Sequence, residues 1–234
     1  MLKNNIISEQ EIFKVQNFDD VMIDYRKIGD TDIPLVVLDN FYVNPEGVRD
    51  FALSLPFTKS RYVCNASPGT RVRIELDVRH LRELCYHLLK LPKWSIKPTT
   101  CQAVFTRMRS DESLRPEQTN PHIDGIDMLN AAAVIYLNDN EECAGGTAFY
   151  RHKETGLDIV QRNSELNSTY DNYPQKRKDY GDLITESNEE WEMIDFVDMK
   201  FNRMLVYPPN VFHSGYMDRN DFVDYDRITQ LCFF

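Results

Sequence analysis

The sequence contains no long hydrophobic run and no excess of positive charge. A helix that spans a bilayer needs about 18 or more consecutive apolar residues, and no segment approaches that length. The net charge is −10, from 27 Lys and Arg against 37 Asp and Glu, which disfavours binding to the phosphates of nucleic acid. We therefore expect neither a membrane protein nor a nucleic-acid-binding protein.

The sequence also has no Cys-x-x-Cys pair, although it contains five cysteines. These are Cys64, Cys85, Cys101, Cys143 and Cys232, an odd number without the spacing of a structural zinc site or a redox pair. The opening residues, MLKNNIISEQ, have no apolar core of the kind a signal peptide needs. Together these features predict a reducing, cytoplasmic location.

Length and composition indicate one domain without disulfides. A chain of 234 residues with 42% hydrophobic residues buries enough surface to form its own core. We predict a single domain over residues 1–234, divided into an α/β support region at 1–100 and a β-rich core at 101–234. A polar stretch at about 154–190 is too long for a simple connection, so we interpret it as a lid or a mobile insertion.

Two amphipathic helices are expected in the support region, after a short strand that begins at Pro34. Asn44 is a suitable N-cap and is followed by Pro45 at the first helical position. The apolar residues then recur with the helical period and stop at Pro56, at positions Val48, Phe51, Ala52 and Leu55. A second apolar stripe of the same kind comprises Leu81, Leu84, Cys85 and Leu88.

Strand signals dominate the second half of the chain. Short runs rich in β-branched and aromatic residues alternate with turn residues, in the segments CQAVFTRMR, AAAVIYLN, GTAFYRH, WEMIDFV, RMLVYPP and RITQLCFF. Short strands at this spacing are typical of a sandwich or a barrel.

Three residues form a candidate metal site. His122 and Asp124 are separated by one residue, so on a strand their side chains point to the same side. His213 follows much later, at the end of the strand-like segment RMLVYPPNVFH. Two imidazoles and one carboxylate are the ligand set of non-haem Fe(II) oxygenases. On these residues alone, a hydrogen-bonded structural histidine is the favoured interpretation and a metal site is the alternative.

The last predicted strand carries a cation on a face that is otherwise apolar. Arg227 and Thr229 alternate with residues of the opposite face and share their own face with Leu231 and Phe233. A charged group in such a place needs an anionic partner. A guanidinium with a neighbouring hydroxyl suits the carboxylate of a small molecule, and an internal Arg–Asp or Arg–Glu pair is the alternative.

Five motifs follow one another along the chain: PHIDG (121–125), VIYLN (134–138), GGTAFY (145–150), VFHSGY (211–216) and RIT (227–229). Together they resemble the motifs of the Fe(II)/2-oxoglutarate-dependent oxygenase superfamily, and of its prolyl-hydroxylase-like branch in particular. The resemblance covers about 102–233. It implies a mainly β fold with flanking helices: a double-stranded β-helix, also called a jelly roll and cupin-like, whose N-terminal helices support one sheet. We expect the chain to belong to an uncharacterised bacterial or viral subgroup of this superfamily.

The same resemblance implies a role for each matching residue. His122, Asp124 and His213 would hold Fe(II), and Arg227, Tyr136 and Thr229 would bind the distal carboxylate of 2-oxoglutarate. The expected enzyme is a dioxygenase that uses O2 to hydroxylate a peptide side chain, an amino acid or a small metabolite, releasing succinate and CO2. Because the related halogenases lack a carboxylate at the Asp124 position, hydroxylation is favoured over halogenation.

Two other functions stay open at this point. The chain could be a catalytically silent jelly roll that binds a ligand, or a redox-neutral metalloenzyme of the cupin type. The first predicts a broken ligand set, and the second leaves Arg227 and Thr229 unexplained.

Three further histidines have a structural or surface interpretation. His80 and His87 lie about 10.5 Å apart along the second helix and cannot share a metal. His152 ends a predicted strand, where a surface position is favoured over one facing a substrate.

Overall fold

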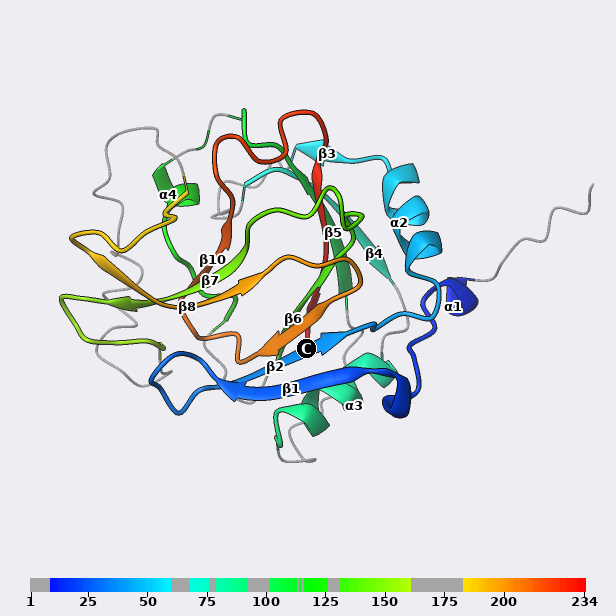
Figure 1. Cartoon of the computed structure of the whole chain (residues 1–234), viewed down its shortest axis with the longest axis horizontal. Helices are drawn as coiled ribbons and strands as arrows, with labels where there is room; N and C mark the ends of the chain where they lie inside the picture. Colours follow the sequence, from blue (N-terminus) through cyan, green and yellow to red (C-terminus); the bar gives the residue numbers. More distant parts are fainter. Residues whose placement is uncertain are drawn as a thin grey trace, which may run out of the picture.

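The computed structural model describes residues 9–59, 68–75, 79–91, 102–112, 114, 116–125, 131–160 and 183–234. Figure 1 shows a molecule made mainly of strands, with a few helices at its periphery. The helices are α1 (Glu9–Ile12), α2 (Pro45–Ser54), α3 (Arg79–Leu88) and α4 (Pro116–Thr119), with one 3-10 turn at Phe18–Asp20. The strands are β1 (Met22–Lys27), β2 (Pro34–Asp39), β3 (Thr58–Lys59), β4 (Thr70–Glu75), β5 (Gln102–Met108), β6 (Ala132–Tyr136), β7 (Gly146–His152), β8 (Trp191–Asp198), β9 (Met204–Tyr207), β10 (His213–Tyr216) and β11 (Arg227–Phe233).

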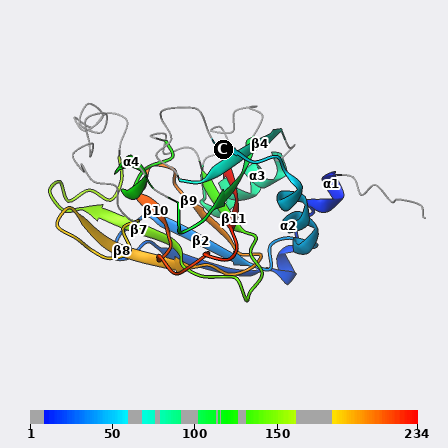
Figure 2. The ribbon, with the colours of Figure 1, turned by 90° about the horizontal axis from the view of Figure 1, so that it is seen from above.

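The described strands form two antiparallel sheets. The large sheet has eight strands in the order β1-β2-β9-β6-β11-β5-β4-β3, and the small sheet has three in the order β10-β7-β8. Figure 2 shows β7, β8 and β10 on one side of the molecule and α2 on the other. The prediction of a mainly β fold with flanking helices is confirmed.

Helix α2 forms where the sequence predicts it. The side chain of Asn44 accepts a hydrogen bond of 3.0 Å from the backbone N–H of Gly47, which satisfies a donor that the first turn leaves free. Val48 and Ala52 are fully buried on the inner side of the helix. Burial of a Val side chain contributes about 1.5–3 kcal/mol, so this apolar stripe anchors the helix on the sheet.

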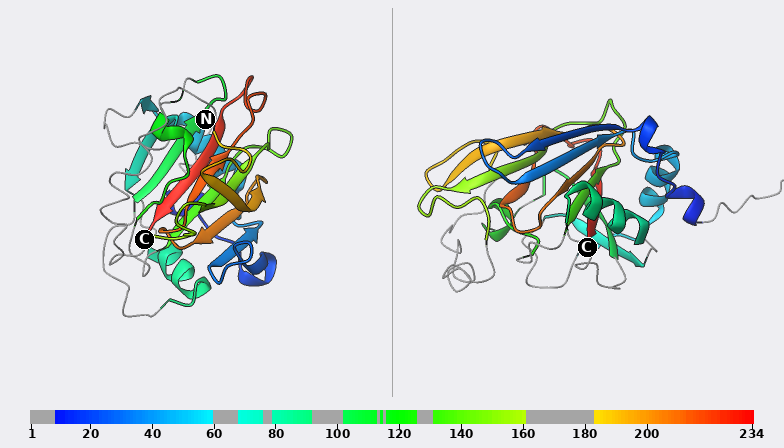
Figure 3. Two further views of the ribbon diagram at one scale, coloured as in Figure 1. Left: turned by 90° about the vertical axis from the view of Figure 1, so that its left-hand side faces the viewer. Right: turned by 90° about the horizontal axis from the view of Figure 1, so that it is seen from below.

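Both longer helices pack against one face of the large sheet. Val48 of α2 and Leu81 of α3 belong to the same buried cluster as Phe105 of β5 and Ile135 of β6. Figure 3 shows α2 and α3 beside the large sheet in two further views. A second buried cluster lies between the sheets and includes Val134, Phe149 and Leu205. The large sheet therefore has helices on one face and the small sheet opposite the other.

The predicted strands exist, but the segment RMLVYPPNVFH is divided between two sheets. β9 ends at Tyr207 in the large sheet, and β10 begins at His213 in the small sheet. A turn separates them, with a hydrogen bond from Val211 N to Pro208 O. Prolines lack the N–H that a continuous ladder needs, and this is the physical reason why the segment cannot be one strand.

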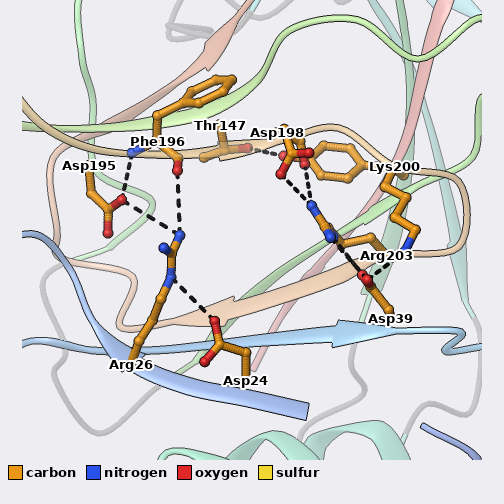
Figure 4. A network of polar contacts seen from close by, with 10 residues as sticks. Asp24, Arg26, Asp39, Thr147, Asp195, Phe196, Asp198, Lys200 and Arg203 are labelled. Atoms are coloured by element: carbon orange, nitrogen blue, oxygen red, sulfur yellow. Dashed lines mark hydrogen bonds and ion pairs between the residues drawn. The ribbon is translucent and has the colours of Figure 1, made fainter. Parts of the chain in front are cut away.

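A polar network joins the first strands to the small sheet (Figure 4). Arg203 donates to both carboxylate oxygens of Asp39 at 2.6 and 3.0 Å, and Lys200 donates to the same carboxylate at 2.7 Å. Arg203 also pairs with Asp198 at the end of β8. Arg26 of β1 reaches the carbonyl of Phe196 in β8 at 3.4 Å. These contacts hold β1 and β2 against one edge of the small sheet.

Most of the predicted insertion at about 154–190 lies outside the described residues, because residues 161–182 are not among them. Val160 and Ile184, on either side of that gap, belong to a buried cluster with Tyr150, Trp191 and Phe212. Cys64 and Cys101 also lie outside the described residues. Among the described helices, none combines the length and the hydrophobicity that crossing a membrane requires.

Candidate metal centre

Backbone pairing between two distant segments brings the three candidate ligands together. His122 N donates to His213 O at 2.8 Å, and His213 N donates to His122 O at 2.9 Å, which forms an isolated antiparallel bridge at the edge of the small sheet. Asp124 N donates to Pro209 O at 2.8 Å, so the backbone of Asp124 is fixed by the turn that precedes β10. The bridge, rather than a long regular strand, places the His122 and Asp124 side chains.

The side-chain geometry fits a single metal ion. Asp124 Oδ2 lies 3.3 Å from His213 Nε2, and Asp124 Oδ1 lies 3.8 Å from His122 Nε2. All three ligand atoms lie within 4.8 Å of one another. Metal–ligand bonds of about 2.0–2.2 Å at right angles place neighbouring ligand atoms about 3 Å apart. Small side-chain adjustments would therefore let these residues share one ion.

The protonation states of two of the three side chains suit a metal ligand. Burial, reinforced by His213 and Arg71, lowers the pKa of His122 to about 3 against the opposing effect of Asp124, so this imidazole is neutral at pH 7. Burial acts to raise the pKa of Asp124, but His213, His122 and Arg71 outweigh it and keep the carboxylate ionised. Burial likewise opposes protonation of His213, yet Asp124 raises its pKa overall.

His213 is also held by its second ring nitrogen. Its Nδ1 lies 3.0 Å from the carbonyl oxygen of Val211, an acceptor that requires the proton to be on Nδ1. Nε2 is then the nitrogen that faces Asp124. This arrangement, a backbone carbonyl behind a histidine, is the usual way in which proteins orient an imidazole toward a metal.

A cavity between the sheets contains the three side chains together with Arg227 and Thr229. Arg227 is only 8% exposed, yet among the described residues it has no carboxylate within ion-pair distance. Its Nη2 donates to Gly146 O at 2.9 Å, its guanidinium carbon lies 5.6 Å from the ring centre of Tyr136, and its Nε has no hydrogen-bond partner. The interpretation of Arg227 as half of an internal ion pair is therefore wrong for the described part of the chain.

The two other residues proposed to contact a cosubstrate have internal partners. Thr229 Oγ1 lies 2.6 Å from Thr106 Oγ1, and both threonines line the cavity. Tyr136 Oη lies 2.7 Å from Thr147 Oγ1, and of these two only Thr147 is among the lining residues. Burial raises the pKa of Tyr136 to about 12, so it carries its proton at pH 7. Its role toward a cosubstrate stays a prediction.

Sequence reasoning missed four polar side chains of the cavity. They are Arg71 of β4, Thr106 of β5, Thr147 of β7 and Tyr207 of β9. The ring of Tyr207 packs edge-on against His213 with centroids 4.9 Å apart. Strand alternation in the predicted strands CQAVFTRMR, GTAFYRH and RMLVYPP could have indicated Thr106, Thr147 and Tyr207. Arg71 had no such signal, because β4 was not predicted as a strand.

The remaining histidines lie away from this site. His152 is 2% exposed, with its Nδ1 2.8 Å from Thr155 Oγ1 and its ring 5.1 Å from that of Trp191. The expectation of a surface position was wrong because the segments before and after the gap at 161–182 pack over this part of the small sheet. His87 is exposed on α3, and the side chain of His80 lies outside the described residues.

Fold and site define a mainly β protein of two antiparallel sheets with a candidate His-Asp-His metal site in the cavity between them. The chain belongs to the family of unknown function DUF6445, whose model matches residues 19–230. No curated protein matches it. Among solved structures it is similar to EctD from S. alaskensis with bound Fe, at 11% identity and a TM-score of 0.42 over 96% of this chain and 87% of that one.

Proposed function

We propose that this protein is an Fe(II)- and 2-oxoglutarate-dependent oxygenase. The observation that carries the proposal is the combination of His122, Asp124 and His213 with a buried arginine, Arg227, in one cavity. A ligand set of two imidazoles and one carboxylate leaves coordination positions open for other molecules. A cation that lacks an acidic partner suits a cosubstrate that has a second carboxylate.

The order of the strands supports the finer fold assignment, a double-stranded β-helix. From β5 onward the chain passes between the sheets: β5, β6, β9 and β11 belong to the large sheet, while the His122 bridge, β7, β8 and β10 belong to the small one. The four large-sheet strands are neighbours, in the order β9-β6-β11-β5. Such alternation between facing antiparallel sheets is the pattern of a jelly roll.

In the proposed reaction, iron and 2-oxoglutarate supply the oxidising chemistry with O2, and the chain supplies binding and orientation. Asp124 contributes a charged ligand, and the Val211 carbonyl orients His213. Arg227 binds the distal carboxylate through its unused donors, next to Thr229. Met108, Val134 and Leu231 line the same cavity and exclude water from it. Because Asp124 is present, hydroxylation rather than halogenation is the proposed outcome.

The proposed substrate is a peptide side chain, a free amino acid or another small metabolite. The net charge of −10 disfavours a nucleic-acid substrate. A cytoplasmic location is part of the same proposal.

An anaerobic titration of the Fe(II)-loaded protein with 2-oxoglutarate tests this function. Chelation of Fe(II) by the keto acid produces a weak metal-to-ligand charge-transfer absorption band. We expect the band in the wild type and a large rise in the 2-oxoglutarate Kd for Arg227→Met. Lys153→Met is the matched control, because it removes one positive charge at an exposed position and should leave the titration unchanged.

Each other result of that titration contradicts part of the proposal and favours a different function or a different role for Arg227. Iron binding without the band contradicts the 2-oxoglutarate assignment and favours a redox-neutral metalloenzyme of the cupin type. Absence of iron binding contradicts the whole proposal and favours a silent ligand-binding jelly roll. A band that is equally strong in Arg227→Met contradicts the role of Arg227.

A further inference from the structure

A second arginine lines the cavity from another strand of the large sheet. Arg71 of β4 pairs with Thr106 of β5, and Thr106 pairs with Thr229 of β11. Residues that are directly opposite in neighbouring strands have their side chains on the same face, so Arg71 shares the cavity face with both threonines. Arg71 lines the cavity together with His122 and Asp124.

Arg71 has no acidic partner among the described residues. Its Nε is buried and has no hydrogen bond, and no carboxylate in the described part of the chain lies within ion-pair distance. Asp124 is close enough to influence its charge, but this carboxylate already faces the two histidines. A partly buried cation without an anion costs free energy, and burial lowers the pKa of Arg71 accordingly.

A second cation, Arg73, lies beside Arg71 on the solvent-exposed part of β4. It lies two residues further along β4, on the same face as Arg71, and is exposed. Arg73 is close enough for its charge to contribute, after burial, to the lowered pKa of Arg71. Two cations on one face of β4, of which Arg71 lines the cavity and Arg73 is exposed, favour the approach of an anion.

Arg71 and Arg227 are positioned to bind different groups. Two strand spacings, about 10 Å, separate the backbones of β4 and β11. Arg227 is oriented toward β7 of the small sheet by its bond to Gly146 O, whereas Arg71 extends from β4, two strands away from β11 in the large sheet. The candidate metal ligands line the same cavity as these two cations.

We propose that Arg71 binds a negatively charged group of the substrate, a carboxylate or a phosphate, and that Arg73 assists its entry. This inference rests on the proposed oxygenase function, in which Arg227 is already assigned to 2-oxoglutarate. It narrows the substrate to anionic molecules. It also makes Arg71 a residue that determines specificity without being required for binding of the cosubstrate.

The test uses matched pairs of small molecules that differ in one anionic group. The pairs are amino acids with their amides, and phosphate monoesters with their parent alcohols. Each compound is titrated by calorimetry into the anaerobic protein loaded with Fe(II) and 2-oxoglutarate. The wild type is compared with Arg71→Met, which keeps most of the side-chain volume, with Arg71→Lys, which keeps the charge, and with the control Lys153→Met.

We expect at least one anionic compound to bind the wild type while its neutral partner does not. Loss of a charge-assisted hydrogen bond should raise the Kd in Arg71→Met roughly ten- to a hundredfold, with a smaller rise in Arg71→Lys and none in Lys153→Met. The pairs also distinguish a carboxylate from a phosphate. Thermal unfolding of each variant reports whether it is folded.

Three results overturn the inference: a panel with no anionic binder, equal binding of the anionic and neutral partners, or unchanged binding by folded Arg71→Met. Loss of the charge-transfer band in Arg71→Met also overturns it, because Arg71 would then belong to the cosubstrate site. If the wild type itself shows no band, the oxygenase proposal fails separately. The same pairs titrated into the metal-loaded protein then test Arg71 alone.

Discussion

His122 and His213 are joined by two backbone hydrogen bonds, 2.8 and 2.9 Å long, and their rings lie 4.6 Å apart. The two residues are distant in the sequence, and their bridge adds the His122 segment to the edge of the small sheet at β10. The distance between their side chains is therefore set by strand pairing. A metal ion bound there would link two segments that the backbone already holds together.

Removal of one imidazole should abolish tight metal binding without unfolding the protein. His213→Ala leaves two ligands, and the loss of affinity for Fe(II) should exceed the roughly 10- to 100-fold loss caused by changing a residue that only hydrogen-bonds to a metal ligand. Titration with Fe(II) or Co(II) measures this loss. His87→Ala is the control, since His87 is exposed on α3. Equal metal affinities for the two variants would contradict the site.

Gly215 lies next to the guanidinium of Arg227, and we expect its small size to keep that group accessible to a ligand. A Cβ atom at Gly215 would lie 3.6 Å from Arg227 Nη1, an ordinary contact, so Gly215→Ala should bind 2-oxoglutarate almost as the wild type does. The longer side chain of Gly215→Leu should fill the space in front of the guanidinium and prevent cosubstrate binding. The charge-transfer titration measures both variants.

The Gly215 pair of variants has its own internal control. Because Gly215 is not among the residues with a positive φ angle, neither substitution strains the backbone. Iron affinity should be unchanged in both. Equal cosubstrate affinities for Gly215→Ala and Gly215→Leu would mean that the anion lies elsewhere in the cavity.

Local sequence patterns were sufficient to predict the elements whose signals are contained in a few neighbouring residues. The cap at Asn44 and the stripe with Val48 and Ala52 predict α2, and each is observed. The alternation in RITQLCFF places Arg227 and Thr229 on the cavity face, as observed. In each case the period of the chain itself determines the direction of the side chain.

Features that depend on pairing between distant strands were not predictable in this way. Arg71 lines the cavity only because β4 pairs with β5, and the sequence TRVRIE of β4 alternates charged with apolar residues without a stronger signal. The division between β9 and β10 likewise depends on which sheet each segment joins. These choices are made by packing of the whole domain, which a local pattern does not encode.

Asn138 fixes the start of the strand that carries Arg227. Its Nδ2 donates to Asp226 O at 2.8 Å, and its Oδ1 accepts from Ile228 N at 2.7 Å, so its bonds bracket the arginine. Asn138→Ala removes the partner of one buried backbone group, Ile228 N, and of one partly buried group, Asp226 O. We expect a loss of about 2–4 kcal/mol in the free energy of unfolding, together with weaker 2-oxoglutarate binding.

A second buried asparagine separates general destabilisation from displacement of Arg227. Asn202 accepts from Tyr42 N at 2.8 Å and donates to Tyr42 O at 3.0 Å, far from the start of β11 in sequence. Asn202→Ala should destabilise the protein by at least as much, because the positive φ angle of Asn202 (60°) also disfavours alanine, and it should leave cosubstrate affinity unchanged. Urea unfolding and the charge-transfer titration provide the two measurements. Equal loss of cosubstrate affinity in both variants would contradict a specific role for Asn138.

The ion pairs of Asp39 should make the protein sensitive to acid. Burial acts to raise the pKa of the Asp39 carboxyl, but the hydrogen bonds and charges of Arg203 and Lys200 outweigh it and hold the pKa below its usual value. A carboxyl whose pKa is lower in the folded state stabilises the fold above its unfolded pKa of about 3.9. That stabilisation disappears as the pH falls through the folded pKa.

Asp39→Asn should accordingly be less stable than the wild type by about 1–3 kcal/mol near pH 7, and the difference should shrink as the pH falls below 4. Urea unfolding over a series of pH values measures it. Asp32→Asn is the control, because Asp32 pairs with Lys27 at a surface position that is 96% exposed, where ion pairs contribute little. A difference for Asp39→Asn that stays constant with pH would show that lost packing, rather than lost charge, destabilises the variant.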